Sequence, residues 1–141
     1  MATDLTMAHL DLKATKASRK RQLARLVAER LVALGHDAHV VEGHVAPSGH
    51  RDLVIVMSSI GLVHTTASNS TDPNASILVS DIEDGGQKFL EGKDWVAYGW
   101  VDRAGRTLLQ FVRADHILGR LSISKAEIRC LADGTLSTVL Q

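Results

Sequence analysis

The hydrophobic positions between residues 15 and 34 repeat at helical spacing and form one apolar stripe. Gly35 follows the last of them, and glycine commonly ends a helix because it accepts a left-handed backbone. The pattern therefore predicts a long amphipathic helix from about Thr15 to Leu34. The predicted stripe consists of Leu23, Leu26, Val27, Leu31 and Leu34.

Three apolar runs follow the helix and are separated by short polar links. The middle run, residues 52–57, is apolar on both faces and rich in β-branched side chains, which is typical of a central buried strand. Residues 37–44 precede it across a turn at residues 46–49, and residues 60–66 follow it. We therefore expect an antiparallel meander of three strands.

The second half of the chain is less regular. Residues 67–75 are polar and predict a loop, whereas residues 77–79 suggest a short strand. Two strand-like runs flank a turn of hairpin composition, Asp102-Arg103-Ala104-Gly105. These runs cover residues 95–101 and 107–112. Residues 81–93 are acidic and contain three glycines, and they leave room for a short helix at 87–91.

The C-terminal tail allows two structures. Ser124-Lys125-Ala126-Glu127 matches a capping box and favours a helix. Asp133-Gly134 lies between two apolar runs and favours a hairpin, which is the structure we expect. One helix ahead of a mixed, largely antiparallel sheet indicates an α/β domain. A single domain over residues 1–141 with a flexible arm at 1–12 fits this order.

The composition narrows the class of protein. The chain has 141 residues, of which 45% are hydrophobic and 23% charged, as expected for a globular domain. No apolar run is long enough for a membrane span, and residues 1–11 do not resemble a secretory signal. Cys130 is the only cysteine, which favours a reducing compartment, so we expect a cytoplasmic location. It lies in an apolar run, so we expect it to be a buried structural thiol.

Basic residues gather at the beginning of the predicted helix, although the formal net charge of the chain is zero. Such a run can contact the phosphates of a nucleic acid, or it can be an ordinary solvated helix face. Glu29 is the only acidic residue of this helix, and we expect it at the surface. The candidate phosphate contacts are Lys13, Lys16, Arg19, Lys20, Arg21 and Arg25.

The opening helix, the buried run Arg51-Asp52-Leu53-Val54-Ile55-Val56 and the strand pair starting at Lys93 together resemble the PD-(D/E)xK nucleases. The resemblance covers about residues 15 to 120, and its motifs are diffuse. It implies a restriction-endonuclease-like fold. It also implies a site in which two carboxylates hold Mg²⁺ and a lysine two residues beyond the second carboxylate positions the attacking water.

The resemblance makes Asp52 the first carboxylate and the metal ligand. The following strand should supply the second carboxylate and the lysine, but it reads Val63-His64-Thr65 there. The catalytic motif is therefore expected to be degenerate. A literal acid-x-lysine occurs only later, as Glu91-Gly92-Lys93, and it offers an alternative catalytic pair for Asp52, with Asp81 as another acid.

Four histidines, at positions 36, 39, 44 and 50, cluster along the sequence, but their spacing fits no established metal site, and we expect them in loops and at strand edges. Trp95 and Trp100 stand five apart in one run, which places them on opposite faces of a strand.

Three functions remain open. The first is a degenerate nuclease-like domain that binds DNA or a protein of a nucleic-acid-processing system. The second is an active Mg²⁺-dependent nuclease that uses Asp52, Glu91 and Lys93. The third is a homodimeric interaction module without nucleic-acid activity, which the zero net charge favours.

Overall fold

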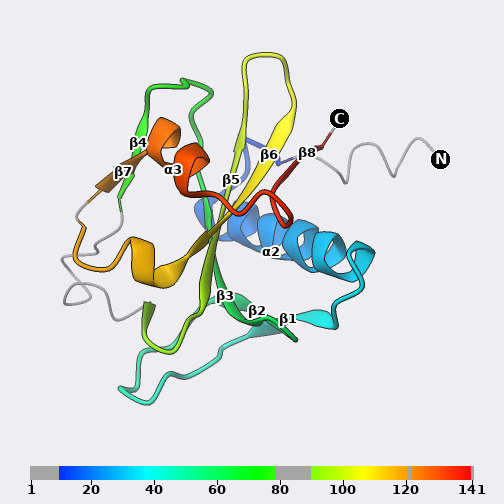
Figure 1. Ribbon diagram of the computed structural model, residues 1–141, viewed down its shortest axis with the longest axis vertical. Helices are drawn as coiled ribbons and strands as arrows, with labels where there is room; N and C mark the ends of the chain where they lie inside the picture. The colour runs from blue at the N-terminus through cyan, green and yellow to red at the C-terminus, as the bar shows by residue number, and fades with distance from the viewer. Residues whose placement is uncertain (1–9, 79–89, 121, 141) are drawn as a thin grey trace.

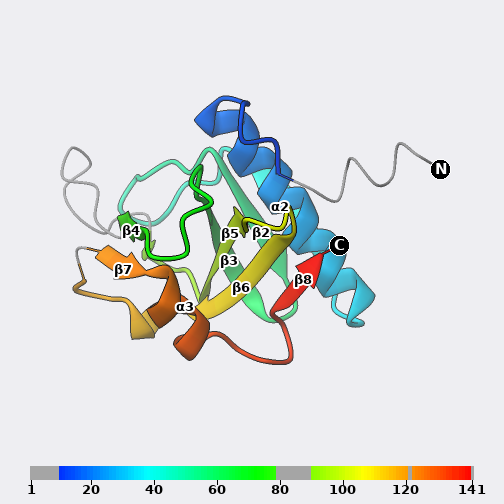
Figure 2. The ribbon, with the colours of Figure 1, turned by 90° about the horizontal axis from the view of Figure 1, so that it is seen from above.

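A long helix lies across one face of a sheet in the computed structural model, which describes residues 10–78, 90–120 and 122–140 (Figure 1). A short second helix lies on the other face (Figure 2). The described elements are α2 (Lys16–Ala33), β1 (Ala38–Glu42), β2 (Val54–Ser58), β3 (Gly61–Ala67), β4 (Ser76–Leu78), β5 (Trp95–Val101), β6 (Thr107–Arg113), the 3₁₀ helix η2 (Ala114–His116), β7 (Ser122–Ser124), α3 (Lys125–Leu131) and β8 (Thr138–Leu140).

Helix α2 begins and ends close to the predicted positions. The side chain of Thr15 accepts a hydrogen bond from the Ser18 amide at 3.1 Å, which caps the first turn. The left-handed Gly35, with a φ of 94°, ends the helix. The predicted apolar stripe is buried except for Leu34, which is 39% exposed because it is the C-cap residue, beyond the last turn that faces the sheet.

The large sheet has the order β1-β2-β3-β5-β6-β8 within the described residues. The expected meander β1-β2-β3 is antiparallel, and the expected hairpin β5-β6 is present. Between them, β3 and β5 run parallel, so the two strands begin at the same end of the sheet. The predicted α/β class with a mixed, largely antiparallel sheet is confirmed.

The two faces of the sheet carry separate apolar clusters. Alternation along β5 supplies both of them: Ala97 packs under α2, whereas Tyr98 packs on the side of α3. Trp95 belongs to the first cluster and Trp100 to the second, which confirms their predicted opposite orientation. The sheet is therefore a middle layer between α2 on one side and α3 with the β4–β7 pair on the other (Figure 2).

The expected hairpin in the C-terminal tail is wrong, because the capping box prevails. The Ser124 side chain accepts from the Glu127 amide at 3.1 Å, and α3 follows. After α3 the chain turns at Asp133 and returns as β8 to pair with β6. Cys130 is exposed and not buried as expected, because Ile128 holds the inward position of this short helix.

A buried lysine fastens α3 to the loop after β3. Lys125 is 1% exposed, and its Nζ donates to the carbonyl oxygens of Ser70 at 2.7 Å and Asp72 at 2.9 Å. The same ammonium lies 5.4 Å from the centre of the Trp100 ring. These contacts hold the polar loop that the sequence predicted between β3 and β4.

Parts of the sequence-based predictions lie outside the described residues. These are most of the expected N-terminal arm, the acid Asp81 and most of the short helix considered at 87–91. Across the described ranges, no helix combines the length and the apolar character that crossing a membrane requires.

Gly61 should tolerate alanine less well than Gly105. Both have positive φ angles, 117° and 81°, and the value at Gly61 lies further from the left-handed region that other residues can adopt. Only at Gly61 would an added Cβ collide with a neighbour, the Asp94 side chain, which accepts a hydrogen bond from the Leu62 amide at 3.0 Å. Urea unfolding should show Gly61→Ala losing about 1–3 kcal/mol more than Gly105→Ala, as overpacking commonly costs. Equal losses would contradict this reading of the β2–β3 turn.

Candidate functional site

The hairpin between β1 and β2 extends beyond the two strands. A backbone bridge joins Val45 to Arg51, and the Asp52 amide donates to the carbonyl oxygen of His44 at 2.8 Å. This extension carries His44, His50 and Asp52 on one short piece of backbone. It leaves the sheet on the side where the chain enters β5 (Figure 1).

Asp52 is 3% exposed and forms a buried ion pair with Lys93. The Lys93 Nζ lies 2.9 Å from Asp52 Oδ2, and its side chain has no exposed surface. The same Nζ lies 3.4 Å from the carbonyl oxygen of Glu91. The structure thus brings together the three residues that the sequence offered as an alternative catalytic set, although the Glu91 carboxylate accepts from the Ser48 amide, at 3.3 Å.

Two histidines complete the surroundings of the Asp52 carboxylate. His44 Nδ1 lies 3.2 Å from Oδ2, and His50 Nε2 lies 3.5 Å from Oδ1. Their side chains are 23% and 17% exposed, so both imidazoles lie at the boundary between the interior and solvent. The sequence placed these residues in loops but held no signal for their convergence on Asp52. Of the same sequence cluster, His36 lies instead beside Ser59.

Lys20 and His64 lie within electrostatic reach of this group. Burial lowers the pKa of Lys20, while the negative charge of Asp52 opposes the shift. Burial also holds the pKa of His64 well below its usual range, and the positive charges of Lys20 and Lys93 add to that effect. His64 is therefore neutral, on a strand next to the one that Asp52 precedes.

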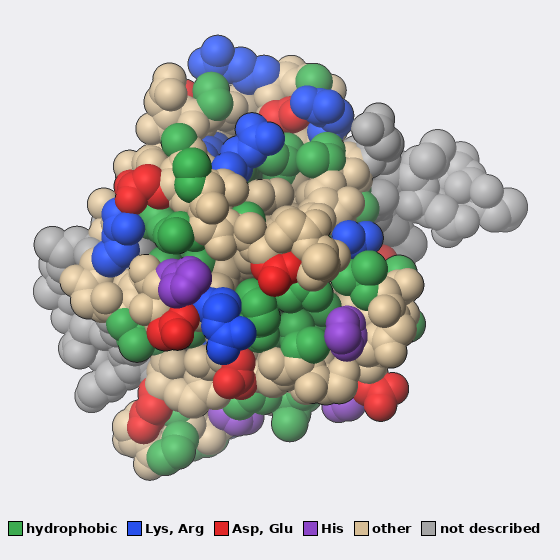
Figure 3. Space-filling view, in the orientation of Figure 1, with side chains coloured by type: hydrophobic (Ala, Val, Ile, Leu, Met, Phe, Trp, Pro, Cys, Tyr) green, Lys and Arg blue, Asp and Glu red, His purple; other side chains and the backbone are tan. Residues whose placement is uncertain are grey.

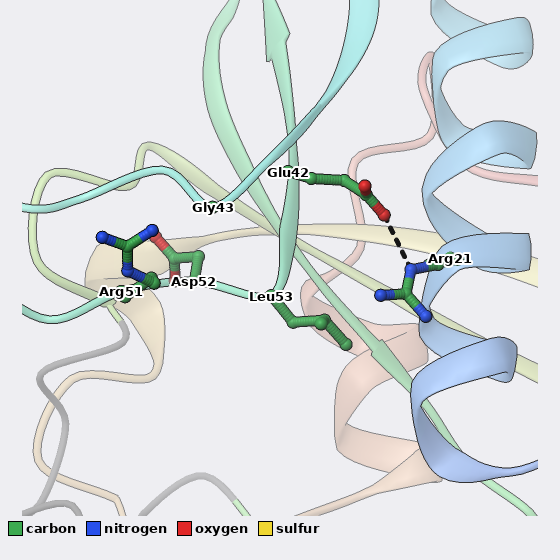
Figure 4. A pocket seen from close by; sticks show the side chains of 6 residues that line it. All are labelled: Arg21, Glu42, Gly43, Arg51, Asp52 and Leu53. Carbon is green, nitrogen blue, oxygen red and sulfur yellow. Dashed lines mark hydrogen bonds and ion pairs between the residues drawn. The ribbon is translucent and has the colours of Figure 1, made fainter.

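An open pocket of about 430 Å³ lies between the hairpin extension and α2. Figure 4 shows Arg21 of α2 facing Glu42 of β1 across this space, joined by an ion pair of 2.7 Å. Leu53 points toward the helix from below (Figure 4). The lining residues are Arg21, Glu42, Gly43, Arg51, Asp52 and Leu53.

The basic residues of the N-terminal helix divide into two groups. Lys13, Lys16, Arg21 and Arg25 are exposed, as a phosphate-contacting surface requires. Arg19 is partly buried and donates to the Ala14 carbonyl oxygen. Lys20 is also partly buried and lies near Asp52, as described above. Glu29 is exposed, which confirms the expectation for that residue.

The side chains around Asp52 do not fit Mg²⁺, which takes oxygen ligands. Both carboxylate oxygens face nitrogen atoms, and the Lys93 ammonium occupies the place beside the carboxylate that a divalent cation would take. Val63 and Thr65, which stand where the resemblance requires an acid and a lysine, are fully buried, and Val63 is part of the core under α2. In the described part of the chain, no three acidic, histidine or cysteine side chains are placed to bind a metal ion.

The ion pair should stabilise the fold only as a pair. Lys93→Met alone leaves a buried carboxylate without its cation, and we expect a loss of about 3–5 kcal/mol in the free energy of unfolding. Asp52→Leu alone should cost a similar amount. The double variant leaves neither charge buried and should recover much of the loss, as urea unfolding would measure. Additive losses in the double variant would show that the two side chains do not interact.

The pH dependence of stability should report the buried His64. In the unfolded chain this imidazole has its usual pKa of about 6.5. In the folded chain burial lowers the pKa of His64 well below that value, so the folded chain takes up the proton only at a lower pH. The contribution of neutral His64 to the free energy of unfolding is therefore fully present above the unfolded pKa of about 6.5. It decreases as the pH falls below that value, by up to about 1.4 kcal/mol per pH unit. His64→Gln should lose stability less steeply than the wild type between pH 7.5 and 5. Parallel curves would mean that His64 is not held neutral.

Comparison of the chain with protein-family models, curated proteins and solved structures finds no match. The resemblance to the PD-(D/E)xK nucleases therefore stays a prediction from the sequence.

Proposed function

We propose that this chain is a nuclease-like domain that binds nucleic acid and whose Asp52 site is not a magnesium centre. The observation that carries the proposal is the excess of cations at one corner of the molecule. Lys20 and Lys93 lie near Asp52 in the interior, and Arg21 and Arg51 line the adjoining pocket. Electrostatic attraction to phosphates supplies most of the affinity of nonspecific nucleic-acid binding.

Helix α2 extends this positive corner along the surface. No acidic residue occurs between Asp11 and Glu29, and Lys13, Lys16 and Arg25 are exposed. The face that carries α3 is different, because Figure 3 shows basic and acidic side chains interspersed over it. A polyanion would therefore be attracted to α2 and to the neighbouring hairpin rather than to the α3 face.

Binding should depend on α2 and on salt. We expect Lys16→Gln/Arg25→Gln to bind fluorescently labelled DNA and RNA oligonucleotides more weakly than the wild type. With two phosphate contacts removed, the slope of log K against log salt should fall by about 1.8 for a duplex. Anisotropy titrations across a salt series measure both quantities.

The matched control removes the same charge elsewhere. Arg103→Gln/Arg129→Gln changes two exposed arginines, one in the β5–β6 turn and one on α3. It should leave the affinity and the slope nearly unchanged. Equal effects of the two variants, or binding that does not respond to salt, would overturn the proposal. If the protein alone elutes as a dimer in size-exclusion chromatography, and its elution volume does not change when DNA is added, the interaction module is favoured.

A cleavage assay tests the active-nuclease alternative, which draws support from the contact between Asp52 and Lys93. Plasmid DNA is incubated with Mg²⁺ or Mn²⁺ at high protein concentration, with Asp52→Ala as the control. We expect that neither the wild type nor Asp52→Ala cleaves the plasmid. Cleavage by the wild type that disappears in Asp52→Ala would replace the proposal with the alternative.

A further inference from the structure

The contact between His44 and Asp52 orients an imidazole for proton transfer. Because Nδ1 lies 3.2 Å from a carboxylate oxygen, that nitrogen carries the ring proton, and Nε2 is left as an acceptor. A histidine held in this way by a buried carboxylate is the usual arrangement of a general base. The 23% exposure of the His44 side chain leaves it accessible from solvent.

His50 contacts the same carboxylate in the opposite orientation. Its Nε2 faces Asp52 Oδ1 at 3.5 Å, so its other nitrogen, Nδ1, is the one available to a ligand. The hairpin extension therefore presents two partly exposed imidazoles beside one buried acid, one hydrogen-bonded to it and the other within ion-pair distance. One neutral and one protonated imidazole are the minimum needed to remove one proton and supply another in a single reaction.

The charged and titratable groups that surround this pair come from every neighbouring element. They are Lys20 of α2, His64 of β3, Lys93 before β5 and Arg51 of the hairpin itself. With His64 neutral, the others are cations, and Arg21 adds a fourth positive charge. Among the described residues they are opposed by Asp52, by Glu42, which is paired with Arg21, and by Glu91, whose carboxylate accepts from the Ser48 amide. A substrate that approaches the two histidines is thus attracted if it is an anion, as a phosphodiester is.

The nature of the donor set limits which phosphodiester could react. The residues around Asp52 do not fit a magnesium ion that would position and activate water, and a nucleophile that the substrate itself carries needs no such ion. RNA carries one in its 2′-hydroxyl, whereas DNA does not. We propose that the Asp52-held pair of His44 and His50 cleaves RNA by transesterification that needs no metal ion. This inference rests on the proposed nucleic-acid binding.

The reaction balances with these two side chains. His44 Nε2 takes the proton of the 2′-hydroxyl while the 2′-oxygen forms a bond to phosphorus. The bond between phosphorus and the 5′-oxygen breaks, and protonated His50 donates its Nδ1 proton to the leaving oxygen. The products are a 2′,3′-cyclic phosphate and a 5′-hydroxyl end. Proton exchange with water then restores His44 to the neutral form and His50 to the charged form.

The test uses a short labelled DNA oligonucleotide that contains one ribonucleotide, next to the same oligonucleotide made entirely of DNA. The full chain is incubated with each in the presence of EDTA, and products are separated by electrophoresis. We expect one cut at the ribonucleotide, a cyclic phosphate product and no cleavage of the all-DNA strand.

The variants His44→Gln and His50→Gln should each reduce the cleavage rate by about 100-fold or more, the usual contribution of a general acid or base. Their affinity for the oligonucleotide, measured by anisotropy, should stay within about twofold of the wild type, since α2 supplies most phosphate contacts. His39→Gln, an exposed histidine on β1, is the matched control and should cleave at the wild-type rate.

The outcomes separate this inference from the proposed function. Binding without cleavage overturns the inference and leaves nucleic-acid binding intact, whereas absence of binding overturns both. Cleavage that requires Mg²⁺, that occurs in the all-DNA strand or that persists in both histidine variants also overturns it. Thermal unfolding of the variants shows whether a lost activity reflects a lost fold.

Discussion

The ion pair between Asp52 and Lys93 is the constraint on which this site depends. A carboxylate removed from solvent is costly unless it has a partner, and here the partner is an ammonium group with no exposed surface. The two residues lie 41 positions apart in the chain. Their contact fixes the hairpin extension of the meander against the turn that leads into β5, and the pocket beside α2 has Asp52 in its wall.

The same pair determines which chemistry the site favours. With Lys93 on one oxygen and an imidazole on each, Asp52 cannot offer an open pair of oxygen ligands to a hard cation. A carboxylate in this state instead orients its neighbours, and the imidazoles of His44 and His50 are the groups that it holds. The cations around them suit an anion, and we propose phosphate binding and proton transfer as the two functions of this site.

The layered architecture explains why the site lies where it does. The sheet buries one face under α2 and the other under α3, and the core occupies both. The hairpin extension of residues 43–53 leaves this sandwich and carries few apolar groups, so it is free to hold polar side chains at the boundary with solvent. The N-terminal half of α2 runs beside it, with exposed cations such as Lys16 and Arg25 continuing the positive corner along the helix.

The sequence alone determined the features that depend on neighbours along the chain. Periodicity located α2, the meander and the β5–β6 hairpin, because a helix or strand must turn its apolar side chains to one or both faces. The sequence also grouped Asp52 with Lys93 in an alternative catalytic set, without indicating that the two side chains form a buried ion pair. The tertiary structure decided what local signals could not: which of the two local signals in the tail prevails, that the tail returns to β6, that Cys130 faces solvent, and that Lys93, His44 and His50 converge on Asp52. The physical reason is that these outcomes depend on contacts between distant segments, and no spacing along the chain records which distant partner a buried charge will meet.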